Sequence, residues 1–371
     1  MKDIVFITQL LSQPRCIKRI ESFIDEGYNC KVYGFVSGLY EDNLRHANFK
    51  IDEARSLDKK LSRFKKIIEY IKLILYVKKQ INSKSIVYAF GFEIGIFVSF
   101  LFRRNYIYEE ADVSASRFQN RFLKKFFLRL DKKIIKKSTI TIFTSEGFQD
   151  YIFPDGNPYS YKTIFIHNKL HESFNDLNRK KYNIKYSSNS IIFGFAGLIR
   201  YPNTILRFAR VIGESFPEHE FHFWGDAETD ISNYCDWLEY KNIFFHGPFK
   251  NPENLEEIYN QIDLNIACYD PSSENVKIAE PNKFYESIFF GKPIIVSRDT
   301  FLEKKVKKLE VGYAINACDN KAIKIFVSGL NKDSIQNRSK NCLDRPSDEL
   351  VTNKKNDIGM INELLFERTL Q

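Results

Sequence analysis

The sequence predicts an α/β protein made of two doubly wound parallel sheets of the Rossmann type, facing each other across a cleft. Short, β-branched and continuously apolar runs alternate with helical segments, which is typical of parallel strands covered on both faces. This alternation stops at a polar stretch, residues 171–189, and then restarts. The chain of 371 residues has the length of two such domains. We therefore expect domains at 1–170 and 190–330, a linker at 171–189 and a tail at 331–371.

Each element is expected where apolar runs and helical periods fall. In the first domain the expected strands are residues 4–8, 30–35, 86–90, 106–109, 139–144 and 163–166, and the expected helices are 15–26, 57–82, 93–102 and 117–137. In the second domain the expected strands are 191–196, 220–224, 243–246, 264–269, 293–297 and 313–315, and the expected helices are 203–215, 252–261, 282–290 and 301–308. A last helix, 358–368, carries one apolar face and is expected to dock back onto a domain.

Composition excludes several classes of protein. Aromatic residues make up 15% of the chain, which excludes wholesale disorder. No apolar run reaches the roughly 18 residues of a membrane span, and the N-terminus does not resemble a secretory signal. Six cysteines are scattered without metal-site spacing, so we expect neither a zinc site nor a disulfide framework. We expect a cytoplasmic protein.

Positive charge is concentrated in residues 117–137. Nine Lys or Arg residues lie there against a single acid, Asp131, whereas the whole chain has a net charge of +9. The basic positions recur at helical spacing, opposite an apolar arc that includes Phe118, Phe122 and Phe126. Two interpretations stay open: a solvated face whose Phe stripe packs into its own domain, or attachment to an anionic membrane surface at the cytoplasmic side. We do not expect a nucleic-acid partner, because no binding motif accompanies the charge.

A second constellation lies around residue 283. Pro281 suits the first position of a helix, which places Asn282 and Lys283 in the first turn. Free amides and a cation at a helix N-terminus favour a phosphate group. Glu286, three residues after Lys283, shares its face and could accept hydrogen bonds from ribose hydroxyls. This pattern suits a nucleoside diphosphate.

Residues that follow earlier strands extend the candidate site. Gly197 allows a ligand to approach the backbone, and Arg200 could form a bidentate fork with phosphate. Gly225 and Asp226 close the next strand and could contact a base. An ion pair on a helix surface or a solvated arginine would explain single members of this set, but the ordered spacing favours a binding site.

In these motifs, the second half of the sequence resembles a GT-B glycosyltransferase of the GT4-like group (glycosyltransferase group 1). The resemblance rests on Gly197, Arg200, Gly225, the His246-Gly247 pair and the segment from Pro281-Asn282-Lys283 through Glu286 to Gly291-Lys292-Pro293. It implies that Glu286 holds the donor ribose, that Arg200 and Lys283 hold its diphosphate, and that the first domain binds the acceptor. The chain departs from the family at Ile278, where retaining members commonly carry a carboxylate, so retention or inversion stays open.

Glycosyl transfer also needs a base for the acceptor hydroxyl. Three acids in four positions follow a strand, and we expect Asp112 as the base, with Glu110 second. Glu93 and His167 are further strand-end candidates, and Asp112 or Ser114 could instead cap the basic helix. No Asp-x-Asp motif occurs, so we expect neither a metal nor another cofactor.

These observations predict an enzyme that moves a hexose from a nucleotide-diphosphate sugar to a lipid-linked or surface-polysaccharide acceptor, such as capsule, O-antigen or exopolysaccharide. Two alternatives stay open. One is a nucleotide-sugar 2-epimerase on the same fold, and the other is a non-catalytic basic protein that binds membranes or nucleic acid.

Overall fold

The computed structural model describes residues 3–36, 44, 47–58, 61–82, 84–102, 105–182, 190–199, 201–226 and 240–367. The chain forms two compact units, one made of Met1–His167 with Asn353–Gln371 and the other of Asn168–Thr352. The chain thus leaves the first unit at His167 and returns to it at Asn353. The segment expected as a single tail, 331–371, is therefore divided between the two units.

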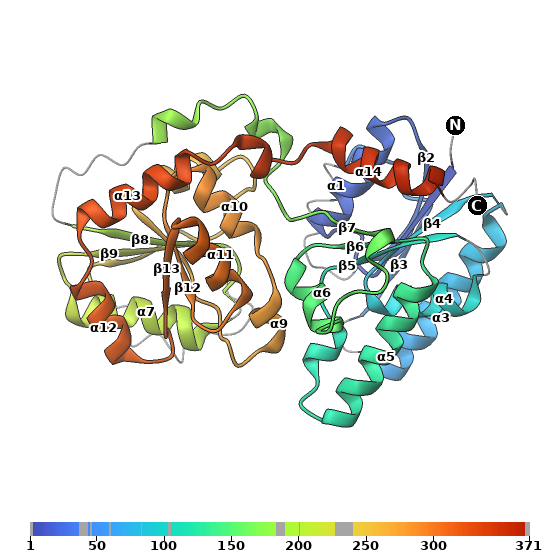
Figure 1. The fold of residues 1–371 in the computed structure, drawn as a ribbon, viewed down its shortest axis with the longest axis horizontal. Helices are drawn as coiled ribbons and strands as arrows, with labels where there is room; N and C mark the ends of the chain where they lie inside the picture. The colour runs from blue at the N-terminus through green and yellow to red at the C-terminus, as the bar shows by residue number, and fades with distance from the viewer. Residues whose placement is uncertain are drawn as a thin grey trace. The chain divides into compact units, whose positions relative to one another are not determined.

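The first unit is a seven-stranded parallel sheet in the order β3-β2-β1-β4-β5-β6-β7. Most of its strands and helices are labelled in Figure 1. Its strands are β1 (Asp3–Thr8), β2 (Asn29–Val36), β3 (Glu53–Ser56), β4 (Ile86–Phe90), β5 (Tyr106–Glu110), β6 (Ile140–Phe143) and β7 (Thr163–Phe165). Its α-helices are α1 (Pro14–Asp25), α3 (Arg63–Gln80), α4 (Phe92–Leu101), α5 (Arg121–Lys137), α6 (Glu146–Ile152) and α14 (Lys354–Glu367). Ile358, Ile361 and Leu365 of α14 are buried in the same apolar cluster as Ile20 and Phe23 of α1. The final helix therefore completes the core of the first unit.

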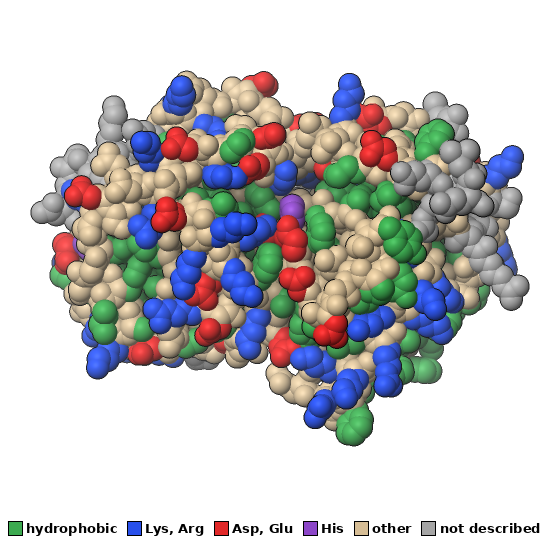
Figure 2. All heavy atoms as spheres, in the orientation of Figure 1, with side chains coloured by type: hydrophobic (Ala, Val, Ile, Leu, Met, Phe, Trp, Pro, Cys, Tyr) green, Lys and Arg blue, Asp and Glu red, His purple; other side chains and the backbone are tan. Residues whose placement is uncertain are grey.

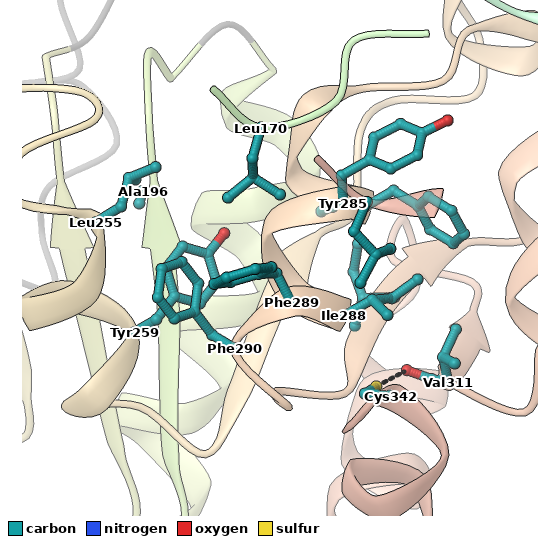
Figure 3. Close-up of a cluster of buried hydrophobic side chains, with 14 of the residues drawn as sticks. Leu170, Ala196, Leu255, Tyr259, Tyr285, Ile288, Phe289, Phe290, Val311 and Cys342 are labelled. Atoms are coloured by element: carbon teal, nitrogen blue, oxygen red, sulfur yellow. Dashed lines mark hydrogen bonds between the residues drawn. The ribbon is translucent and has the colours of Figure 1, made fainter. Parts of the chain in front are cut away.

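The second unit is a six-stranded parallel sheet in the order β10-β9-β8-β11-β12-β13. Its strands are β8 (Ile192–Ala196), β9 (Glu220–Trp224), β10 (Ile243–Phe245), β11 (Leu264–Ala267), β12 (Ile294–Ser297) and β13 (Gly312–Ile315). Its α-helices are α7 (Pro202–Ser215), α8 (Leu255–Asn260), α9 (Glu274–Ile278), α10 (Asn282–Phe289), α11 (Phe301–Leu309), α12 (Asn320–Ser328) and α13 (Lys332–Leu343). Two apolar clusters cover the sheet, and one of them joins α8 and α10 to residues near Leu170 (Figure 3). Two doubly wound parallel sheets confirm the predicted fold class.

Several elements were not predicted, and each has a weak apolar signal. Strand β3 lies at the edge of its sheet, and none of its four residues is fully buried. Helices α12 and α13 bury few apolar side chains, namely Ile323 and Val327 on α12 and Ile335 and Cys342 on α13. Such helices depend on tertiary packing, which periodicity alone does not reveal.

Candidate active site

Helix α10 begins at Asn282, as in the expected range 282–290, and ends at Phe289. Pro281 has extended backbone angles and is the N-cap, so the prediction that it is the first helical residue is wrong. No described side chain caps this end, which leaves first-turn amides for a ligand. The helix ends before Gly291, whose φ of 65° fits the left-handed position that follows many helices.

Two glycine turns lie beside Lys283 of this helix. Gly197 follows β8, and its N–H donates to the Trp224 carbonyl at 2.7 Å. Gly225 follows β9, and its N–H donates to the Gly247 carbonyl at 2.7 Å. A Cβ atom at Gly197 would lie 2.5 Å from the Lys283 Nζ atom, and one at Gly225 would lie 2.4 Å from the Gly197 carbonyl oxygen. Both residues also have positive φ, 141° and 120°. The positive φ angles favour glycine at both positions, and at Gly225 the Gly197 backbone also excludes a Cβ atom.

The Lys283 ammonium has no anionic partner within hydrogen-bond distance among the residues that the structure describes. The residue is 7% exposed, and its Nζ atom lies over the Phe195 ring, 5.1 Å from the centroid. Within the described part of the chain, the structure gives Nζ neither a hydrogen bond nor an ion pair. A largely buried cation costs free energy unless it is paired. This ammonium, beside Gly197 and in the first turn of α10, is therefore suited to an anion.

The Glu286 carboxylate lies one turn further along α10 and is 4% exposed. Asn282 donates to its Oε1 atom at 2.6 Å, and Tyr259 donates to its Oε2 atom at 2.9 Å. Burial raises the pKa of Glu286 above its ordinary value, while Lys283 and these hydrogen bonds lower it. Sequence reasoning missed Tyr259, because a tyrosine in a short helix carries no signal of its partner.

The other residues predicted for this site have different positions. Arg200 lies outside the described residues. Asp226 is exposed, and its carbonyl oxygen accepts the Ile199 N–H at 2.9 Å, so the structure assigns it a turn contact. Glu280 was not predicted for this site, and its fully buried side chain pairs with Lys305 at 2.6 Å. The structure thus brings together Gly197, Gly225, Asn282, Lys283 and Glu286.

In the first unit, the predicted acids at the end of β5 point in different directions. Glu110 is 0% exposed, hydrogen-bonds Tyr108 and accepts the N–H of Asp112 at 3.1 Å. Through this hydrogen bond, Glu110 holds the loop that carries Asp112. Asp112 itself is exposed just after the strand. Glu109 is also 0% exposed and pairs with Arg15 and Arg19 at 3.1 and 3.2 Å.

The basic helix α5 begins at Arg121 rather than at residue 117. Its N-cap is Asn120, which accepts the N–H groups of Phe122 and Leu123, so Asp112 and Ser114 do not have the capping role considered for them. Phe122 is 85% exposed and Phe126 is 54% exposed. Phe122 and Phe126 therefore do not pack into the first unit, whereas Phe118 stacks on Phe127 with ring centroids 4.3 Å apart. The alternative in which the stripe packs into its own domain holds for only part of the stripe. The side chains that α5 buries fully are Asp131, Ile134 and Ile135.

Solved structures share this fold over nearly the whole chain. HepE of Anabaena, in complex with UDP and glucose, matches with a TM-score of 0.70 at 14% identity, covering 98% of this chain and 99% of that chain. Sucrose-phosphate synthase of Thermosynechococcus elongatus matches with a TM-score of 0.69 at 12% identity, over 99% and 100%. MnaA of S. aureus, in complex with UDP, matches with a TM-score of 0.61 at 12% identity, over 100% and 98%. No protein-family model and no curated protein sequence matches the chain. The structural likeness shows that the chain has the GT-B fold.

Proposed function

We propose that this protein is a glycosyltransferase that moves a hexose from a nucleotide-diphosphate sugar to a lipid-linked or surface-polysaccharide acceptor. The observation that carries the proposal is the Lys283 ammonium, which lies beside the Gly197 turn, one helical turn before the Glu286 carboxylate, and forms no ion pair with any described residue. A diphosphate and a ribose, joined in one molecule, match these two groups. The GT-B neighbours HepE and MnaA were solved with UDP, which supports the same class of ligand.

The proposed chemistry requires two things of the protein. As the acceptor oxygen attacks the anomeric carbon, the bond to the diphosphate breaks and negative charge develops on the leaving group. Lys283 and the α10 amides would stabilise that charge without a metal ion. A base must also take the acceptor proton, and Asp112 is our candidate because it is exposed directly after β5.

Removal of the Lys283 ammonium should weaken diphosphate binding selectively. We expect Lys283→Ala to bind UDP or GDP about 10- to 100-fold more weakly, because a charge-assisted hydrogen bond contributes about 1.5–3 kcal/mol. Affinity for uridine or guanosine should change little. Calorimetric titration measures both, with Lys321→Ala as the control, since Lys321 lies in the first turn of α12 of the same unit and is exposed. If Lys283→Ala bound UDP and GDP as tightly as the wild type does, that result would contradict the proposed donor site.

A nucleotide-sugar 2-epimerase is the second candidate, favoured by the likeness to a structure described as a UDP-N-acetylglucosamine 2-epimerase of Listeria monocytogenes, which matches with a TM-score of 0.59 at 12% identity. An epimerase would convert UDP-N-acetylhexosamine without any acceptor, whereas a transferase would turn over only when an acceptor is present. Product analysis with and without a membrane extract as the acceptor source separates the two reactions.

We further propose that helix α5 attaches the enzyme to an anionic membrane, where a lipid-linked acceptor would lie. Lys and Arg side chains gather over α5, with a hydrophobic side chain among them at its lower end (Figure 2). Phe122, Leu123 and Phe126 are 85%, 45% and 54% exposed on this helix. None of the described helices has both the length and the hydropathy of a membrane span. Exposed aromatic side chains among cations suit the interface of anionic lipids.

The membrane proposal predicts binding that needs both charge and apolar contact. Wild-type protein should float with phosphatidylglycerol vesicles at low salt and not with phosphatidylcholine vesicles. The pair Phe122→Ser with Phe126→Ser should bind about tenfold more weakly, because interfacial burial of two Phe side chains is lost. Ile325→Ser is the control, since Ile325 is 65% exposed on α12. Failure of the wild type to float at low salt would refute this proposal and leave the donor site untouched.

A further inference from the structure

The Glu286 carboxylate is held by a buried network that sequence reasoning did not find. Tyr259 is 0% exposed, and its ring stacks on Phe290 with centroids 4.8 Å apart (Figure 3). The Tyr259 hydroxyl donates to the Glu286 Oε2 atom at 2.9 Å. Stacking fixes the ring, so the hydroxyl has a defined position next to the carboxylate.

The direction of this hydrogen bond follows from the next residue in the network. Asn265 on β11 is 0% exposed, and its Nδ2 atom donates to the Tyr259 hydroxyl oxygen at 3.2 Å and to Ser287 Oγ at 2.6 Å. Because the phenolic oxygen accepts from Asn265, its own proton is directed to Glu286. The network therefore favours an ionised acceptor at that carboxyl group.

From this geometry we infer that Tyr259 is a positioning residue for the donor site. Its hydroxyl holds the Glu286 carboxylate in one rotamer, with an acceptor direction left for a ribose hydroxyl. The inference rests on the proposed function, in which Glu286 binds the ribose of a nucleotide sugar.

The hydrogen bonds that Glu286 already accepts limit how many ribose hydroxyls its carboxylate can bind. A carboxylate offers about four acceptor directions. Tyr259, Asn282 and Asn251 each donate to this one. About one direction then remains, so Glu286 should accept from a single ribose hydroxyl. Of the 2′-deoxy and 3′-deoxy nucleoside diphosphates, one should bind much more weakly than the parent and the other should bind almost normally.

The charged and titratable groups around the carboxylate set its pH dependence. Lys283 lies on the same helix, Tyr259 lies on α8, and Tyr269 faces Tyr259. Burial raises the pKa of Glu286, and the Tyr259 hydrogen bond lowers it. Loss of the hydroxyl should therefore raise this pKa further. Because the ribose hydroxyl needs the ionised carboxylate, the acid-side loss of nucleotide binding should begin at a higher pH in Tyr259→Phe.

The experiment titrates wild type, Tyr259→Phe and Tyr313→Phe with UDP or GDP and with their monodeoxy analogues across pH 5–8. Tyr313 is the matched control, because its hydroxyl contacts Ser334 elsewhere in the same unit. In Tyr259→Phe we expect about 3- to 10-fold weaker binding at neutral pH, from the loss of one hydrogen bond. The penalty for the missing ribose hydroxyl should shrink, and the acid limb should move to higher pH. Tyr313→Phe should behave as the wild type does in both respects.

A purely structural role would lower the melting temperature and leave the acid limb and the deoxy penalty unchanged. That result, with normal binding by the wild type, would overturn this inference and leave the donor site standing. Wild-type protein that binds neither UDP nor GDP would end the proposed function and this inference together. If Tyr259→Phe does not fold, Asn265→Ser tests the same network, because it removes the donor that orients the Tyr259 hydroxyl. It should shift the acid limb in the same direction.

Discussion

Replacement of Asp131 by asparagine is expected to stabilise the first unit, by about 1–3 kcal/mol above pH 7 and by progressively less at lower pH. Asp131 lies on α5 with 0% exposure, and Tyr108 donates to its Oδ1 atom at 2.9 Å. Its Oδ2 atom is buried and has no hydrogen-bond partner in the part of the chain that the structure describes. Burial raises the pKa of Asp131 to about 7, and the neighbouring Glu110 also has a pKa well above its ordinary value because of burial and the Asp131 charge.

The sign follows from the raised pKa. Between about pH 4 and pH 7 the unfolded chain has already lost the Asp131 proton, whereas the folded protein keeps it. Wild-type stability therefore falls across this window as pH rises, and the penalty is constant above it. Asparagine does not titrate, and its amide would face Glu110 with a donor in place of a second negative charge. The other acids near the pair, Glu93 and Asp112, remain in both proteins.

Measurement requires a probe of the first unit. Residues 1–167 and 353–371 contain no tryptophan, so tryptophan fluorescence does not report on α5. Hydrogen exchange of peptides from β5 and α5, in denaturant at pH 5 and pH 8, gives the stability of the relevant part. Asp150→Asn, an exposed acid of α6, is the control. If Asp131→Asn changed the stability of the first unit by the same amount at both pH values, the buried pair would not hold a proton.

The same elements show what sequence could and could not predict. Glu109 and Glu110 are adjacent in β5, so their side chains point to opposite faces of the sheet. Arg15 and Arg19 of α1 pair with Glu109 on one face, while Glu110 lies beside Asp131 of α5 on the other. A central strand covered on both sides buries both acids. The sequence showed three acids after a strand, but only the assembled layers show that Asp112 alone is exposed.

Helix α5 shows the same limit for amphipathic patterns. Its sequence contains two possible apolar arcs, and periodicity does not decide which one faces the sheet. The structure buries Ile134 and Ile135 and leaves Phe122 and Phe126 exposed. By contrast, Lys283 and Glu286 were predicted correctly to share one face of one helix, because a spacing of three residues depends on helix geometry alone. Their partner Tyr259 is 27 residues from Glu286, and no local rule links the two.

Loss of the Arg179 guanidinium is expected to destabilise the second unit by about 3–5 kcal/mol and to disturb the donor site through α10. Arg179 is 9% exposed. It donates to the carbonyls of Ile288 and Phe289 at 3.1 and 3.2 Å, at the end of α10, and to that of Cys342 at 2.8 Å, near the end of α13. It also donates to the carbonyl of Arg345. One planar side chain thus satisfies the last carbonyls of two helices, where positive charge is favourable.

Arg179→Met keeps most of the apolar volume but leaves these buried carbonyls without a donor, which is the costly case for polar groups. Arg179→Lys keeps the positive charge but not the planar set of guanidinium donors, so its loss of stability should be intermediate. Tryptophan fluorescence in urea measures the second unit directly, because Trp224 belongs to it. Arg210→Met is the control, since Arg210 forms a surface pair with Glu214 on one helix and should contribute about 0.5 kcal/mol or less.

Because α10 carries Lys283 and Glu286, folded Arg179→Met protein should also bind UDP or GDP more weakly than Arg210→Met. Equal urea midpoints for Arg179→Met and Arg210→Met would show that α10 and α13 are held by their apolar contacts rather than by this guanidinium.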